Sequence, residues 1–285
     1  MHTVGMEMNA KLPDRTMIVG VLNVTPDSYV PESRATTVND AVARAGQMLQ
    51  DGADIIEIGG ESTGPGSKDV RLDDELSRVI PVIQAIRKAY PDAVLSLDTY
   101  KAAVAREGLE EGVTIINDVT AGRGDADLFK VVADAGAFLV LMYAKDAGPR
   151  TTVREDRYGD VIATITKFLS GRKGVAEAAG VPSAKIILDP GLGHFVSSDP
   201  AYSFEILARL RELRALGCPL LVSPSRKSFL AGSEQLPVKD RLPGTVAASA
   251  IAVLNGADYV RTHDVPEIRR AVEIAGSIRR AGGSL

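Results

Sequence analysis

Eight short apolar runs recur along the 285-residue chain, and each is followed by a longer amphipathic segment. Most runs consist of Val, Ile and Leu without polar alternation, which is typical of parallel strands buried on both faces. Eight consecutive strand–helix units predict a parallel α/β fold. The predicted strands are Met17–Leu22, Ile55–Ile58, Val94–Leu97, Val113–Ile116, Phe138–Met142, Ile186–Leu188, Leu220–Val222 and Tyr259–Val260.

The joints that lead from each predicted helix back to the next strand are short. Six of these seven joints carry a glycine, and the seventh carries Tyr90-Pro91. Glycine is common just after helices because that position often needs a positive φ, and proline also stops a helix. The predicted helices are Asp40–Gln50, Asp74–Tyr90, Lys101–Glu110, Asp127–Asp134, Val161–Ala179, Tyr202–Leu216, Thr245–Asn255 and Pro266–Arg280.

The joints that lead from strand to helix are longer and rich in polar residues, which favours a site at the C-terminal ends of the strands. An open doubly wound sheet places its site at the same ends. We favour a closed (β/α)₈ TIM barrel, because eight units match it and such barrels have about 250 residues. We expect one domain over residues 1–285, with frayed tails at Met1–Arg15 and Ala281–Leu285.

Composition narrows the class of protein further. The net charge is −4 and no cluster of Lys and Arg is present, which argues against a nucleic-acid surface. No apolar run approaches the ~20 residues that span a bilayer, and the first fifteen residues do not resemble a signal peptide. Cys218 is the only cysteine, so no internal disulfide can form. These features fit a cytoplasmic protein.

Polar residues follow nearly every predicted strand. Each one alone is often a helix cap or a turn former, and we interpret Glu61, Asp118 and Asp264 in this way. In a barrel, however, the strand ends converge on one cavity. Buried carboxylates and amides there need partners, which a polar ligand would supply.

The chemistry of these residues falls into two clusters. In the first, two carboxylates could accept hydrogen bonds from the N–H edges of a flat heterocycle, while an amide and an ammonium serve its carbonyl and ring nitrogens. This cluster consists of Asp98, Asn117, Asp189 and Lys227.

The second cluster combines Asn23 with Arg261 and His263. Arg261 and His263 are two residues apart on one strand, so they point the same way and suit a phosphate. Asn23 could add an oxygen ligand for Mg²⁺. No Walker loop, Rossmann glycine spacing, zinc-ligand pattern or nucleophile elbow is present.

Seven motifs in order along nearly the whole chain resemble those of the dihydropteroate synthases in the pterin-binding barrel family. The first motif and the Ser-Arg-Lys motif are the most specific. The motifs are Gly20–Ser28, Gly59–Thr63, Ser96–Thr99, Ile116–Val119, Leu188–Gly193, Ser225–Phe229 and Val260–Asp264.

The resemblance implies that the chain joins 7,8-dihydropterin-6-ylmethyl diphosphate to 4-aminobenzoate and releases pyrophosphate. By motif, the first cluster would hold the pterin, and the second would hold the diphosphate, with Mg²⁺ at Asn23. Ser228 would touch the aminobenzoate, and Thr63 and Met142 complete the implied substrate-binding set. The resemblance also implies a homodimer through late helices. The catalytic residues it implies are Asp98, Lys227, Arg261 and His263.

The sequence departs from the family pattern in its loops. Pro31 replaces an aspartate, Gly64 an arginine, Tyr143 a histidine and His194 a phenylalanine, while Val196 stands where a lysine is usual. These changes concern the aminobenzoate end, and parts of the chain (236–240 and 255–263) are similar to sulfonamide-insensitive synthases. We therefore expect either a working synthase with divergent loops or an altered aminobenzoate pocket with weakened sulfonamide inhibition.

Two other functions stay open. A non-catalytic pterin-binding paralogue would fit the loss of polar groups at Pro31 and Gly64. A methyltetrahydrofolate-binding methyltransferase shares the barrel and the pterin-binding carboxylate and amide. It binds no diphosphate, so Ser225–Lys227 and Arg261–His263 argue against it.

Overall fold

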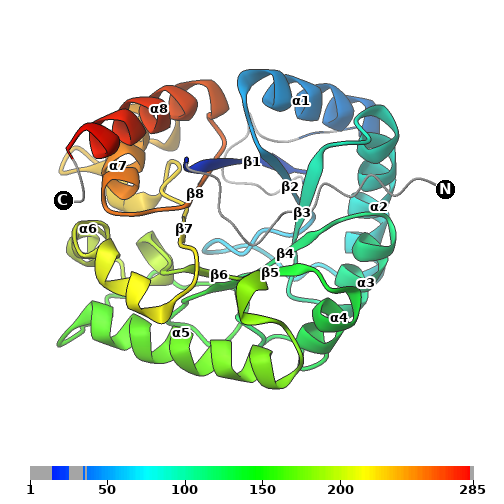
Figure 1. Cartoon of the computed structure of the whole chain (residues 1–285), viewed down its shortest axis with the longest axis horizontal. Helices are drawn as coiled ribbons and strands as arrows, with labels where there is room; N and C mark the ends of the chain where they lie inside the picture. The colour runs from blue at the N-terminus through cyan, green and yellow to red at the C-terminus, as the bar shows by residue number, and fades with distance from the viewer. Residues whose placement is uncertain (1–14, 26–34, 36, 283–285) are drawn as a thin grey trace.

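The eight strands of the protein form a ring surrounded by helices, seen along the barrel axis in the computed structural model (Figure 1). The structure describes residues 15–25, 35 and 37–282. The strands are β1 (Met17–Asn23), β2 (Ile55–Gly59), β3 (Val94–Asp98), β4 (Ile115–Asp118), β5 (Phe138–Met142), β6 (Ile186–Asp189), β7 (Leu221–Val222) and β8 (Tyr259–Thr262).

All strand pairs are parallel, in the order β6-β5-β4-β3-β2-β1-β8-β7. A parallel bridge between Leu188 and Leu220 joins β6 to the residue before β7 and closes the ring. The predicted TIM barrel is therefore confirmed, and the open sheet is excluded.

Eight α-helices cover the outside of the described barrel. All six glycines at the helix-to-strand joints have positive φ, between 61° and 101°, as the sequence predicts. The helices are α1 (Val38–Asp51), α2 (Leu72–Ala89), α3 (Ala102–Glu110), α4 (Leu128–Ala135), α5 (Val161–Ala178), α6 (Pro200–Ala208), α7 (Leu242–Leu254) and α8 (Val265–Ala281).

The helix predicted over Tyr202–Leu216 is wrong as a single element. It breaks at Arg209, where α6 ends, and continues as the 3₁₀ helix η4 (Leu210–Leu216). Arg209 pairs with Glu205 on one side of the break and with Glu212 on the other. Over one or two turns, apolar residues recur at similar spacing in both helix types, so the pattern does not distinguish them.

The barrel interior is built in layers because every second residue of a strand points inward. The lower layer is apolar: Val19, Ile55, Ile115, Val140, Ile187, Leu221 and Tyr259, with Val94 packed against it. Two residues further along each strand, towards the C-terminal ends, most interior positions become polar. These positions are Val21, Glu57, Ser96, Asn117, Met142, Asp189, Ser223 and Arg261.

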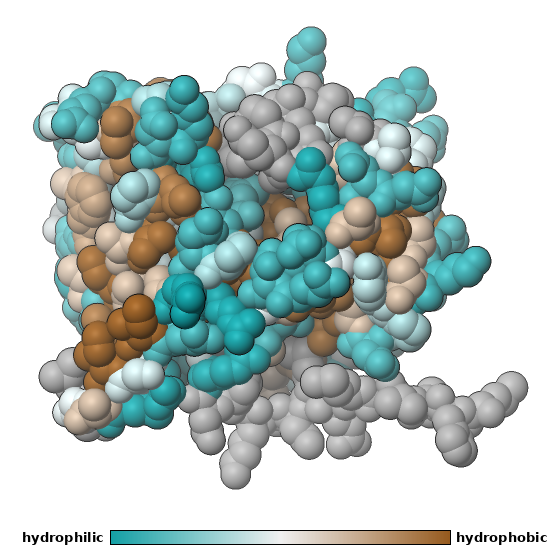
Figure 2. Space-filling model, turned by 90° about the horizontal axis from the view of Figure 1, so that it is seen from above, coloured by the Kyte–Doolittle hydropathy of each residue, from teal (hydrophilic) through white to brown (hydrophobic). Residues whose placement is uncertain are grey.

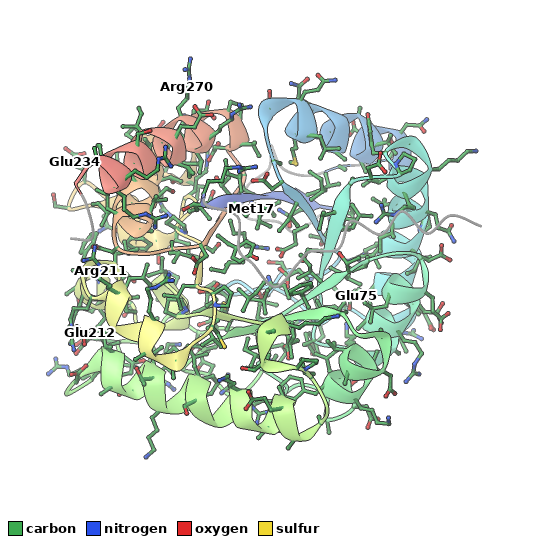
Figure 3. All side chains as sticks on the ribbon, in the orientation of Figure 1. Met17, Glu75, Arg211, Glu212, Glu234 and Arg270 are labelled. Atoms are coloured by element: carbon green, nitrogen blue, oxygen red, sulfur yellow. The ribbon has the colours of Figure 1, made fainter. Side chains whose placement is uncertain are left out.

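Figure 3 shows Met17 and Glu75 inside the ring of helices, whereas Arg211, Glu212, Glu234 and Arg270 lie on the outer surface. In the described residues, no helix combines the length and apolarity needed to cross a membrane. Within the two tails expected to fray, Arg15 forms an ion pair with Asp54, and Ala281 is the last residue of α8. The remainder of both tails falls outside the described residues except Gly282.

Candidate active site

Two adjoining cavities lie at the C-terminal ends of the strands. The inner cavity is lined by nine of the ten site residues that the sequence predicts: Asn23, Thr63, Asp98, Asn117, Met142, Asp189, Lys227, Arg261 and His263. The outer cavity has a volume of about 560 Å³ and is lined by the tenth, Ser228. Ser62, Gly64, Phe195 and Lys227 line both cavities, so the two spaces meet at Lys227.

Arg261 joins the two clusters that the sequence analysis treats as separate. Its Nε donates to Glu57, and its Nη2 donates to Asp98 at 2.8 Å. Burial raises the pKa of Asp98 to about 7, with Arg261 opposing this shift and Glu57 adding to it. Arg261, which is predicted to bind a phosphate, thus also contacts Asp98, which is predicted to bind the flat ring.

Asn117, Asp189 and Lys227 also line the inner cavity. Oδ1 of Asn117 is buried and has no hydrogen-bond partner among the described residues. Leaving a buried acceptor unpaired costs about 1–3 kcal/mol, so a ligand N–H would be favoured there. Asp189 accepts from the backbone N–H of Gly191 at 2.7 Å, and burial raises its pKa despite the charge of Lys227.

Lys227 is a partly buried cation near carboxylates. Its Nζ lies 5.1 Å from the centre of the Phe195 ring, a favourable cation–π distance. Burial lowers the pKa of Lys227 to about 8, and Asp189 and Asp98 oppose that shift. The side chain is therefore mostly charged at pH 7.

His263 is held by Ser225. The backbone N–H of His263 donates to the Ser225 hydroxyl at 3.2 Å, and this hydroxyl lies 2.8 Å from Nδ1. Burial, followed by Arg261, Arg226 and Lys227, lowers the pKa of His263 to about 3, so the imidazole is neutral at pH 7. The Ser225 hydroxyl thus contacts both the backbone and the ring of His263, which fixes the orientation of the imidazole.

The long β5–α5 loop contributes to the outer cavity, although none of its residues was predicted to belong to the site. Its residue Thr151 lines this cavity, is 3% exposed, and forms hydrogen bonds to two other loops. Its backbone N–H donates to the Thr63 carbonyl at 3.1 Å, and its hydroxyl donates to the His194 carbonyl at 2.7 Å. Nothing in the local sequence around Thr151 indicates these contacts, because both partners are far away along the chain.

Only some of the residues that differ from the family pattern line the cavities. Gly64 and His194 line the outer cavity. Tyr143 instead packs near the α5 side, where its hydroxyl bonds that of Tyr158 at 3.2 Å, and Val196 is fully buried. Pro31 lies outside the described residues.

The residues interpreted as structural have structural partners. Asp118 accepts from the backbone N–H of Thr120 at 2.8 Å, and Asp264 pairs with Arg226. Glu61 pairs with Lys101 and also lines the inner cavity. Glu57 is not among the predicted site residues. It is the one acidic residue within the apolar run Ile55–Ile58, and that exception is the signal that identifies it.

Comparison with known proteins gives a consistent result. The family of pterin binding enzymes matches residues 19–263. The dihydropteroate synthase of Synechocystis sp. is 39% identical over 267 residues, covering 93% of this chain and 91% of the relative. A probable bifunctional folylpolyglutamate synthase/dihydropteroate synthase of Halobacterium salinarum is 46% identical over 93% of this chain. The match covers 32% of that relative, so the chain spans about a third of its length.

Solved structures agree with these relatives. The Yersinia pestis dihydropteroate synthase, solved with a sulfonamide drug complex, has a TM-score of 0.89 and 36% identity, with 95% of this chain and 96% of that chain covered. The Xanthomonas albilineans dihydropteroate synthase, solved with 4-aminobenzoic acid, has a TM-score of 0.84 and 36% identity, with 93% and 94% covered. The closed barrel, the motif residues gathered around its cavities and these matches show that the chain belongs to the pterin-binding enzyme family that includes the dihydropteroate synthases.

Proposed function

We propose that this protein joins 7,8-dihydropterin-6-ylmethyl diphosphate to 4-aminobenzoate, forming 7,8-dihydropteroate and pyrophosphate in folate biosynthesis. The observation that supports this most is the pair of adjoining cavities that share Lys227. A polar inner cavity suits the pterin ring with its diphosphate. The outer cavity, lined by Ser228, gives the second substrate an approach to the reacting carbon.

The inner cavity recognises the pterin by hydrogen bonding. Asp189 and Asp98 accept from the N–H edge, Asn117 uses its buried carbonyl oxygen, and Lys227 donates to the ring acceptors. Thr63 and Met142 also line this cavity and would contact the ring.

The reaction begins when the C–O bond to the diphosphate breaks. The electron pair leaves with the diphosphate, and the resulting cation is delocalised into the dihydropterin ring. Arg261 supplies a fixed positive charge for the leaving group, and the neutral His263 ring supplies an N–H donor. Asp98 places a negative charge beside the cation.

The arylamine then forms the C–N bond with its lone pair. An aromatic amine is neutral at pH 7, so no strong base is required, and the proton is released to water. Ser228 holds the aminobenzoate in the outer cavity. Positioning and fixed charges supply most of the acceleration.

Mg²⁺ fits the inner cavity at Asn23. A methyl group at Gly59 would lie 3.5 Å from Oδ1 of Asn23, so the glycine keeps space open beside this oxygen. The described residues hold no cluster of three His, Cys, Asp or Glu for a metal, and Mg²⁺ commonly combines few protein ligands with waters and substrate phosphate. When bound, the ion would help neutralise the departing diphosphate.

A pyrophosphate-release assay tests the function directly. The purified protein should release pyrophosphate and form dihydropteroate when both substrates are present. Tight binding of the dihydropterin without pyrophosphate release, with both substrates and Mg²⁺ supplied, would indicate the non-catalytic paralogue instead.

We further propose a homodimer through the late helices. Phe204 on α6, Ile251 on α7, and Ile274 and Ile278 on α8 are large apolar side chains exposed by 45–62%. Figure 2 shows apolar surface gathered on the side where α7 and α8 lie in Figure 1.

Sedimentation equilibrium should give twice the 30.1 kDa chain mass, and Ile274→Glu should shift the measured mass towards that of the monomer. A wild-type monomer at micromolar concentration would reject the proposal.

Weakened sulfonamide inhibition is a separate proposal about the outer cavity. It is supported by Gly64 and His194, two family departures that line this cavity. Sulfonamides should inhibit pyrophosphate release less strongly than they inhibit an ordinary synthase assayed beside it. The double variant Gly64→Arg/His194→Phe should become more sensitive. Ordinary sensitivity in the unmodified protein would reject the idea.

A further inference from the structure

Glu57 occupies an unusual position in the barrel. It is the polar residue of the β2 run, it is 1% exposed, and it points into the barrel one layer below the strand ends. An unpaired carboxylate is very costly to bury, so its partners must account for its presence. Its partners are Arg261 and the hydroxyl of Ser96, which donates to it at 3.2 Å.

The ion pair between Glu57 and Arg261 lies inside the barrel and spans strand β1. The two residues come from β2 and β8, which lie on opposite sides of β1 in the sheet. On β1, Glu57 is in register with Val21 and Arg261 is in register with Val19, two residues earlier. The Arg261 side chain therefore extends towards the C-terminal ends of the strands to meet Glu57. The contact therefore spans β1 and depends on the curvature of the sheet and on the register of these three strands.

The guanidinium of Arg261 is held at two edges. Nε faces Glu57, while Nη2 faces one carboxylate oxygen of Asp98 at 2.8 Å. Because the guanidinium is planar and rigid, two anchors on different edges fix its plane. Without Glu57, Arg261 could turn to bind both oxygens of Asp98, a favourable bidentate arrangement. That turn would occupy a carboxylate proposed to serve the pterin.

We propose that Glu57 is a positioning residue that fixes the Arg261 guanidinium between the leaving diphosphate and Asp98. This inference rests on the proposed function. Glu57 touches neither substrate in this scheme and acts through Arg261, so its removal should affect the chemical step more than aminobenzoate binding.

The pH profile offers a readout beyond simple loss of activity. The charged groups acting on Asp98 are Arg261 of β8, Glu57 of β2, Glu75 of α2 and Asp118 of β4. In the wild type, kcat/KM for the pterin diphosphate should fall below pH about 7 as Asp98 takes up a proton, because the carboxylate is the active form. It should also fall above about 8 as Lys227 loses its proton.

The test variant is Glu57→Gln, which keeps the shape and removes the charge. We expect kcat to drop at least tenfold, with the KM for aminobenzoate within about twofold. Removing a negative neighbour favours the carboxylate of Asp98, so the acid limb of kcat/KM should move to lower pH while the alkaline limb stays. Ser96→Ala is the matched control, because it removes a contact of Glu57 without removing the charge.

Glu57→Asp keeps the negative charge but shortens the side chain by one methylene group. It should keep the acid limb near its wild-type position while lowering kcat, since the shorter carboxylate no longer meets Arg261. If Glu57→Gln does not fold, this variant and Ser96→Ala still test the inference. Wild-type kcat in either Glu57 variant, or a lower kcat in Glu57→Gln with an unmoved acid limb, would overturn it. A wild-type protein that releases no pyrophosphate would instead reject the proposed function itself.

Discussion

Replacing Arg261 with alanine should lower kcat for pyrophosphate release by a factor on the order of 10²–10³, the range found when a group that stabilises developing charge is removed. The guanidinium is the fixed cation that we propose for the leaving group, and its loss also removes the ion-pair partner of Glu57 and Asp98. The measurement is initial-rate pyrophosphate release with both substrates saturating.

Binding experiments separate the role of Arg261 at the diphosphate from its role at Asp98. The variant should lose at least tenfold more affinity for the pterin diphosphate than for 6-hydroxymethyl-7,8-dihydropterin, which has no phosphate. Arg209→Ala is a suitable control, since Arg209 also pairs with carboxylates but lies among α5, α6 and η4. Equal losses for both ligands would remove Arg261 from the diphosphate site.

Lys227→Ala or Asp189→Ala should each weaken binding of 6-hydroxymethyl-7,8-dihydropterin by about 1.5–3 kcal/mol, or roughly 10- to 150-fold, measured by calorimetry. Each variant removes a charged hydrogen-bonding group from the inner cavity. It also removes the nearest compensating charge from a remaining group of opposite sign.

The double variant should lose less affinity than the sum of the single losses, because the two charges act on each other. Lys185→Ala is the matched control, since Lys185 also lies over an aromatic ring, that of Phe138, but outside both cavities. Unchanged dihydropterin affinity in both single variants would remove the inner cavity as the pterin site.

Local pattern was sufficient for much of the fold. The apolar runs identified all eight strands, and the glycine joints identified where helices return to the barrel, because strand burial and positive φ impose residue types locally. The exception was the stretch after Ala208, where a 3₁₀ helix replaces the predicted α-helix. Over one or two turns the spacing of apolar residues is similar in both helix types, so the pattern does not report the change.

The sequence by itself determined the barrel and the set of polar residues at its strand ends, since each follows from the residues of one short segment. Only the tertiary structure decided how those residues combine. It placed Arg261 between Glu57 and Asp98, joined the two predicted clusters into one inner cavity, and let Thr151 fasten two loops of the outer cavity. These contacts connect residues up to 204 positions apart. Their geometry is set by sheet curvature, strand register and the packing of loops from different units, which no local sequence pattern contains.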